Sequence, residues 1–171
     1  EILVSRLIDR PMRPLFHKSF KREIQVVPTT VSSDQINPPD ILAMIGASAC
    51  LSISSIPFEG PSGAVRIGRV DGKFVVMPTL SELDSSDMEL VVSGHADAIN
   101  MVEFGGLEVQ EAEIAKAVEI ARGEVQGICA MIADLVAQCG KEKSWTPPPS
   151  TEDLRNRLRE RQGQAVTNFD A

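Results

Sequence analysis

The chain has 171 residues and a formal net charge of -7 at neutral pH, from 24 acidic and 17 basic residues. Hydrophobic residues make up 43% and charged residues 24%, which is typical of a soluble globular protein and excludes a mainly disordered chain. No run approaches about 18 apolar residues, which excludes a membrane-spanning helix. The three Cys and two His show no paired spacing, so neither a zinc module nor a disulfide scaffold is expected.

Residues 1–10 follow a helical pattern with an apolar face and a basic face. Pro11 disfavours helical backbone at the residue before it, so we expect this helix to end near Asp9–Arg10. The pattern begins without a capping residue and no signal peptide is recognisable. We therefore interpret the chain as part of a longer protein.

The middle of the chain predicts strands and one helix. Residues 23–32 are rich in β-branched residues and predict a strand. A turn at 37–39 precedes Asp40, which is expected to cap a helix that runs to Ile53. Asp71–Gly72 lies between 63–70 and 73–77 and is a strong hairpin signal. Two further strands are expected at 89–93 and 98–104.

Residues 109–139 carry an apolar stripe at helical spacing, interrupted by Gly123 and Gly127, which suggest close packing or a kink. A stiff Trp-Thr-Pro-Pro-Pro linker follows at 145–149, and Ser150 with Asp153 can cap a polar helix that extends through Gln162. The pattern as a whole predicts an α+β fold followed by a short helical segment.

The charge is unevenly distributed along the chain. Residues 1–22 hold six basic and two acidic residues, a local charge of +4, so the remainder carries -11. No basic residue occurs between Lys73 and Lys116, whereas nine acidic residues do. A concentrated basic segment can contact phosphates although the total charge is negative.

Arg6, Arg10 and Arg13 are the candidate phosphate-binding residues of this basic segment. Arg6 and Arg10 are four residues apart and leave one helix face together, and guanidinium groups bind phosphate oxygens in pairs. The competing interpretation is a solvated helix end in which Asp9 forms an ion pair with Arg13 or Arg6. Spacing alone favours the second interpretation.

Other residues that could take part in chemistry have plainer interpretations. Glu82, Asp84, Asp87 and Glu89 could form a metal cluster, but a solvated acidic turn that enters a strand is the commoner case. The three Cys lie on apolar helical faces and are expected to be core residues or inert thiols. His17 lies beside the basic segment and could contact RNA.

Six segments together resemble the polynucleotide phosphorylase family in its first RNase PH-like domain. They are Glu1–Phe16 (EILVSRLIDRPMRPLF), Asn37–Asp40 (NPPD) with Met44–Ala49 (MIGASA), Ile56–Gly68 (IPFEGPSGAVRIG), Met77–Thr79 (MPT) and Leu90–Gly94 (LVVSG). The resemblance implies an RNase PH-like β-α-β fold over residues 1–144, a domain that lacks its first part here. Residues 145–171 are then the linker and the start of the family's helical domain.

The resemblance also implies a function. Members of this family degrade RNA from its 3′ end by phosphorolysis, in which inorganic phosphate attacks the terminal phosphodiester and a nucleoside diphosphate is released. They form homotrimers around an RNA channel, use Mg²⁺ or Mn²⁺, and are expected in the cytoplasm, with other RNA-degradation proteins as further partners and no membrane association. Arg6 and Arg10 align with arginines that contact RNA or phosphate in the family, and Arg13 also fits the pattern.

The family's main catalytic set lies in its second RNase PH-like domain and consists of two Asp and one Lys. At the corresponding positions this chain has Leu83, Glu89 and Val91, and neither Leu nor Val can hold a metal or contact a phosphate oxygen. We therefore expect no catalytic residue and no metal ligand in this chain. A catalytically silent RNase PH-like subunit that binds RNA and supports a ring is the alternative function.

Overall fold

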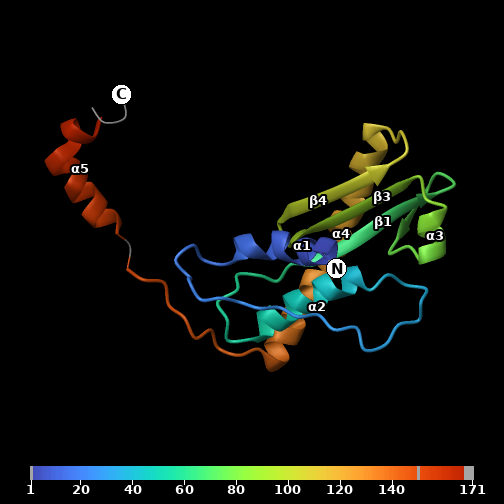
Figure 1. The fold of residues 1–171 in the computed structure, drawn as a ribbon, viewed down its shortest axis with the longest axis horizontal. Coiled ribbons are helices and arrows are strands. Elements are labelled where there is room, and N and C mark those ends of the chain that lie inside the picture. Colours follow the sequence, from blue (N-terminus) through green and yellow to red (C-terminus); the bar gives the residue numbers. More distant parts are fainter. Residues whose placement is uncertain (1, 150, 168–171) are drawn as a thin grey trace.

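The computed structural model describes residues 2–149 and 151–167, and its centre is one antiparallel sheet (Figure 1). The strands are β1 (Gly63–Val70), β2 (Lys73–Val76), β3 (Met88–His95) and β4 (Ala98–Gly106), in the spatial order β2-β1-β3-β4. The helices are α1 (Ile2–Met12), α2 (Asp40–Ile53), α3 (Leu80–Asp84), α4 (Glu111–Cys139) and α5 (Glu152–Thr167), with a short 3-10 turn at Arg13–Leu15. This mixed architecture confirms the predicted α+β fold.

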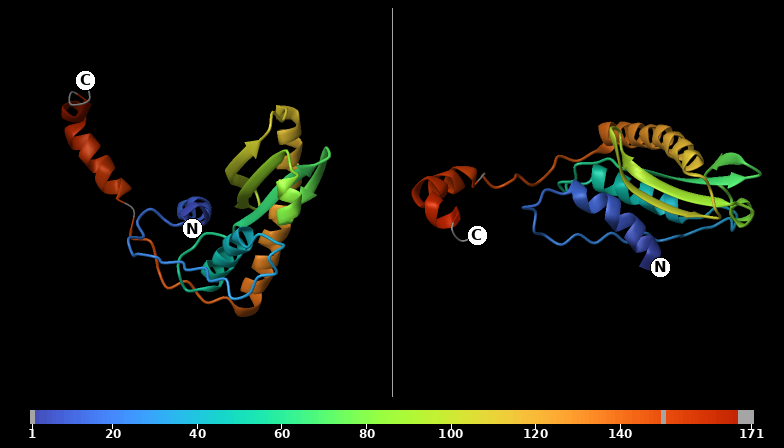
Figure 2. Two further views of the ribbon diagram at one scale, coloured as in Figure 1. Left: turned by 45° about the vertical axis from the view of Figure 1, so that its right-hand side comes forward. Right: turned by 90° about the horizontal axis from the view of Figure 1, so that it is seen from above.

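Helices cover both faces of the sheet, because side chains along each strand alternate in direction. Val65 of β1 and Leu90 of β3 pack against α4, whereas Ala64 and Val91 pack against α1 and α2. Figure 2 shows the resulting three layers, with α4 on one side of the sheet and the two other helices on the opposite side. The apolar core is therefore divided into two halves by the sheet.

The predicted hairpin and the two following strands are confirmed. Asp71 and Gly72 both have positive φ angles, 50° and 75°, which is the backbone of the tight turn that suits strand twist. The register pairs Val70 with Lys73 directly across this turn. The Asp71–Gly72 signal therefore predicted the position of the β1–β2 turn correctly.

The predicted end of the first helix is wrong, because α1 continues through Pro11 to Met12. Pro11 and Met12 are both buried, and Leu15 in the following turn is buried too. Burial of these apolar side chains against α2 and the sheet offsets the lost backbone hydrogen bond at Pro11. The backbone carbonyl of Pro11 also accepts a hydrogen bond of 2.9 Å from Asn100 Nδ2 of β4.

The predicted strand at 23–32 is also wrong. The segment is extended, but it pairs with no other strand in the described part of the chain, and Val27 and Val31 are exposed. β-branched residues are favoured in a strand because they pack well on a half-buried sheet. Their presence does not ensure that a neighbouring strand is available to pair with the segment. In Figure 1 this segment runs below α2 toward a turn at 34–37, where Asp34 Oδ1 accepts hydrogen bonds from the backbone N–H groups of Ile36 and Asn37.

Two details of the helices differ from expectation. Asp40 is the first residue of α2 and not its cap, because the capping position is Pro39 and the Asp40 carboxylate binds Arg66. In α4, a Cβ atom at Gly123 or Gly127 would meet nothing within 4 Å, so close packing does not explain either glycine.

Of the three Cys, Cys129 is buried, and burial raises its pKa, whereas Cys50 and Cys139 are exposed.

The end of the chain leaves the core as an extended segment followed by α5 (Figure 1). The helix covers most of the predicted polar helix, and Ser150, its expected capping residue, lies outside the described residues. No helix in the described ranges is long and apolar enough to cross a membrane.

Candidate nucleic-acid interface

The three predicted arginines lie on one exposed stretch of chain, formed by α1 and the 3-10 turn after it. Their exposure follows from the amphipathic pattern: Leu7 and Ile8 are buried against the core, and this turns Arg6 and Arg10 toward solvent. Arg6 has no ion-pair or hydrogen-bond partner among the described residues. Its guanidinium group is therefore available to an anionic ligand.

Arg10 joins α1 to the edge strand of the sheet. Its Nη1 atom lies 2.5 Å from Oε1 of Glu103 in β4, and the two side chains are 49% and 42% exposed. An ion pair this exposed contributes little to stability and exchanges readily with other partners. Arg10 is thus placed beside Arg6 by helical spacing and held there by a carboxylate that a phosphate can replace.

Arg13 forms the ion pair that the competing interpretation predicted. Its Nε and Nη2 atoms donate to the carboxylate of Asp9 at 3.0 Å and 2.7 Å. The hydrogen bonds and the charge of Asp9 raise the pKa of Arg13. Arg13 remains largely exposed, but its positive charge is partly neutralised by Asp9 of α1.

A groove of about 1080 Å³ runs from α1 along the segment that follows it. Met12, Phe16 and Ile24 contribute apolar walls to this groove, and Arg13 and Arg22 contribute positive charge. The groove therefore combines apolar surface with guanidinium groups, as ligands with both rings and phosphates require.

Three of the four acidic residues considered as a metal cluster, Glu82, Asp87 and Glu89, have other partners, and Asp84 has none among the described residues. Glu82 accepts hydrogen bonds from the backbone N–H and the hydroxyl of Thr79 at the start of α3, and these lower its pKa. Asp87 accepts hydrogen bonds from Arg69, which lower its pKa in the same way. Glu89 forms an ion pair with Arg66 at 2.9 Å.

No group of three or more His, Cys, Asp or Glu is arranged to hold a metal within the described part of the chain. Mg²⁺ and Mn²⁺ need several oxygen ligands with uncommitted charge, and here Glu82 is engaged by a helix cap and Asp87 and Glu89 by arginines, so within residues 2–149 and 151–167 Asp84 is the one uncommitted carboxylate of the four. The described residues therefore do not fit a divalent metal. Val91 and Glu89, the residues compared above with catalytic positions, lie in the core and in an ion pair with Arg66, respectively.

Sequence reasoning missed one aromatic arrangement near the basic segment. The ring of Trp145 lies 5.3 Å from that of His17 and 5.5 Å from that of Phe20, measured between ring centroids. More than 120 residues separate Trp145 from its two neighbours. No local spacing signal links positions so far apart, so only the fold could show this contact.

Comparison with known proteins identifies the relatives of this chain. The domain 1 profile of the 3′ exoribonuclease family matches residues 1–57, and its domain 2 profile matches residues 60–124. "Polyribonucleotide nucleotidyltransferase" of Treponema denticola is 53% identical over 152 residues, 89% of this chain and 22% of that protein. The protein of the same name from Heliobacterium modesticaldum is 48% identical over 168 residues, 98% of this chain and 24% of that protein.

The chain thus spans less than a quarter of the length of these two relatives. Among solved structures, that of rice Rrp46 superposes with a TM-score of 0.48 at 16% sequence identity, over 60% of this chain and 46% of that chain. The two family profiles cover α1, α2, the sheet and the first half of α4. This chain belongs to the 3′ exoribonuclease family and is similar over most of its length to polyribonucleotide nucleotidyltransferases.

Proposed function

We propose that this chain is the RNA-contacting part of a polyribonucleotide nucleotidyltransferase that degrades RNA from the 3′ end by phosphorolysis. In this reaction inorganic phosphate attacks the terminal phosphodiester, and the terminal nucleotide leaves as a nucleoside diphosphate. The similarity to enzymes of that name over 89% and 98% of the chain supports the activity of the longer protein. The chain contributes substrate contacts to that activity.

The observation that carries this role is the state of Arg6 and Arg10 on α1. Arg6 has no partner in the described part of the chain, and Arg10 is held only by an exposed ion pair with Glu103. Both can therefore donate pairs of hydrogen bonds to phosphate oxygens without first breaking a buried contact. Arg13 contributes less, because Asp9 already occupies its guanidinium group.

We assign the reaction chemistry to other parts of the longer protein. The metal, Mg²⁺ or Mn²⁺, needs carboxylates that the described residues do not offer, and inorganic phosphate binds as co-substrate near that metal. Residues 1–144 act as the first RNase PH-like domain, and 145–171 as a linker and the start of a helical domain. The active assembly is a homotrimer in the cytoplasm, with other RNA-degradation proteins as further partners.

The alternative is a catalytically silent RNase PH-like subunit that binds RNA and supports a ring. Val91 is buried and Glu89 is held in an ion pair, so neither residue is free to contact a substrate, which favours this alternative. This holds for the chain by itself and not for the longer protein. Phosphate-dependent release of nucleoside diphosphates by the full-length protein decides between the two functions. RNA binding without such release would contradict our proposal.

The RNA contacts are tested with the double variant Arg6→Ala/Arg10→Ala in the full-length protein. We expect the KM for RNA to rise at least about tenfold, because two charge-assisted contacts are lost. The matched control Glu103→Gln releases Arg10 from its ion pair and should leave the KM unchanged or lower. An unchanged KM and an unchanged salt dependence of RNA binding in the double variant would show that both arginines are only surface charges.

A further inference from the structure

The segment that follows α1 meets the start of the C-terminal linker at one end of the molecule. Phe16, His17 and Phe20 lie on a turn in which the backbone N–H of Phe20 donates to the carbonyl of His17 at 2.9 Å. Trp145 reaches this turn from the end of α4 and contacts His17 and Phe20. Phe16 lies 6.3 Å from Phe20, so the four rings form a continuous aromatic surface.

Contacts with the backbone and side chains of neighbouring segments hold both parts of this surface in place. On one side, Phe16 forms an isolated β-bridge with Phe58, and the two rings are 5.2 Å apart. On the other side, Lys143 Nζ donates to the carbonyl oxygens of Leu51, Ser52 and Ser54 at 3.2, 2.8 and 2.8 Å, at the C-terminal end of α2. These bonds fix residue 143 only two positions before Trp145.

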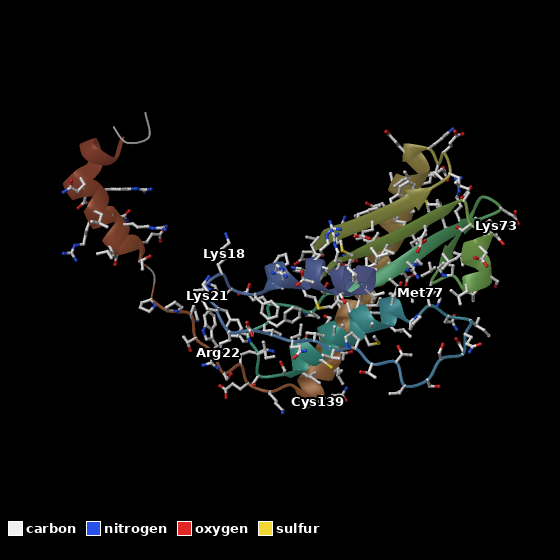
Figure 3. The ribbon with its side chains drawn as sticks, viewed as in Figure 1. Lys18, Lys21, Arg22, Lys73, Met77 and Cys139 are labelled. Carbon is white, nitrogen blue, oxygen red and sulfur yellow. The ribbon has the colours of Figure 1, made fainter. Side chains whose placement is uncertain are left out.

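Three positive charges surround the rings. Lys18, Lys21 and Arg22 are exposed, and none of them has an ion-pair partner among the described residues. By contrast, Arg10 of α1 and Arg13 of the 3-10 turn after it are each paired with a carboxylate. Figure 3 shows Lys18, Lys21 and Arg22 together at the end of the core opposite Lys73, on the side from which the linker to α5 leaves. Glu23 is the only acidic residue within seven positions of Lys18 along the chain.

We propose that these residues form a second RNA-binding surface, which stacks unpaired bases on His17, Phe20 and Trp145 and contacts phosphates through Lys18, Lys21 and Arg22. We call it the aromatic platform. His17 is exposed and the rings of Phe20 and Trp145 are half-buried, and accessible rings beside unpaired cations are the combination that binds single-stranded nucleic acid without sequence preference. Lysine contacts phosphate as a point charge and reads no base pattern, so we expect this surface to bind without sequence preference.

This inference rests on the proposed function, because it takes RNA as the substrate, and it adds a further RNA-binding surface to that function. The residues of the aromatic platform follow α1 along the chain, and His17, Lys18, Phe20 and Arg22 line the same groove as Met12 and Arg13, so we expect an RNA bound at Arg6 and Arg10 to continue along this groove onto the platform. A long RNA reaches both surfaces, whereas an RNA of two or three nucleotides reaches only one. Substrate length therefore separates the two surfaces experimentally.

The charges of the aromatic platform are tested in the full-length protein with Lys18→Gln/Lys21→Gln. The control variant Lys73→Gln/Arg122→Gln also removes two exposed positive charges, but away from the rings. We expect the platform variant to lower the affinity for a 30-nucleotide single-stranded RNA about tenfold and to reduce the salt slope of log K by about 1.4. The control variant should change neither quantity, and phosphorolysis of a trinucleotide should be unchanged in both.

The rings are tested with Trp145→Leu and Trp145→Phe. Because stacking needs an aromatic face, Trp145→Leu should lower the affinity for the long RNA about tenfold, and Trp145→Phe should restore most of it. Photocrosslinking with RNA that contains 5-iodouridine should label Trp145, Phe20 or His17. The Lys18→Gln/Lys21→Gln variant keeps the test valid if Trp145→Leu fails to fold, since both lysines are exposed.

Two results distinguish failure of this inference from failure of the proposed function. If Arg6→Ala/Arg10→Ala weakens phosphorolysis but all platform variants bind long RNA like the unmodified protein, the aromatic platform is wrong and the proposed function stands. If the unmodified full-length protein neither binds nor phosphorolyses RNA, both are wrong.

Discussion

Arg66 is buried in the sheet, with a side chain only 7% exposed, and two carboxylates from different elements neutralise it. Its Nη1 and Nη2 atoms donate to Asp40 of α2 at 3.1 Å and 2.5 Å, and its Nε lies 2.9 Å from Glu89 of β3. A buried arginine with a partner removed leaves an uncompensated charge in the core. This residue therefore ties the start of α2 to the centre of the sheet.

The two partners of Arg66 differ in exposure, and this gives the first prediction for stability. Asp40 is 17% exposed and Glu89 is 51% exposed. We expect Asp40→Asn to lower the free energy of unfolding by about 3 kcal/mol, and Glu89→Gln by less than about 1 kcal/mol. Urea unfolding followed by circular dichroism measures both values, and equal losses would show that burial does not decide the strength of these pairs.

At the scale of elements, α4 lies so close to β1 that one strand residue has no room for a side chain. A Cβ atom at Gly63 would lie 2.7 Å from the Val125 carbonyl oxygen and 3.2 Å from Ile128 Cβ. Small residues Ala117 and Ala121 are fully buried on the same face of the helix. The approach of helix to sheet is therefore set by small side chains on both elements.

Two glycine substitutions should have opposite effects on stability. Gly63→Ala forces α4 away from β1 and should lower the free energy of unfolding by about 1–3 kcal/mol. Gly127→Ala meets no atom within 4 Å and should raise it by about 1 kcal/mol, because alanine is the better helix former. Thermal unfolding of the two single variants measures the difference, and a loss of stability in both would contradict the open space at Gly127.

Local signals predicted the elements correctly where the structure is also local. The hairpin depends on Asp71–Gly72, and α4 depends on an apolar stripe within one segment, so both could be read from neighbouring residues. The errors came from long-range contacts: burial carried α1 past Pro11, and the 23–32 segment lacks a neighbouring strand. For the same reason the sequence predicted Arg6 and Arg10 as exposed neighbours but missed Trp145 beside His17.

At the scale of the whole molecule, one lysine joins the linker to the core. Lys143 binds the carbonyl oxygens that end α2, and the backbone N–H and hydroxyl of Ser144 donate to the carbonyl of Ser55 at 2.9 Å and 3.1 Å. Helix ends leave such carbonyls without intrahelical partners, so a cation there is favourable. The linker therefore starts from a fixed position although the residues after it are extended.

Replacement of this lysine should release Trp145 without unfolding the core. In the 171-residue chain Trp145 is the single tryptophan, so its fluorescence reports directly on this position. We expect Lys143→Met to shift the emission to longer wavelength and to increase quenching by acrylamide, since the ring becomes more exposed to water. Lys141→Met is the matched control, because only the backbone N–H of Lys141 bonds to Ile53. An identical spectrum in both variants would show that the rings alone hold Trp145.

The order of the elements along the chain also has a consequence for synthesis. All four strands lie within 63–106, whereas α1 and α2 precede every strand that covers them. Ribosomes make proteins from the N-terminus, so the contacts of these two helices with β1, β3 and β4 form only after those strands have been made. The sheet, by contrast, joins consecutive segments through short connections and can form as soon as it is complete. Leu7 and Met44 thus share a core with residues that are synthesised later, such as Val91 and Met101, and this half of the core is complete only once the sheet has formed.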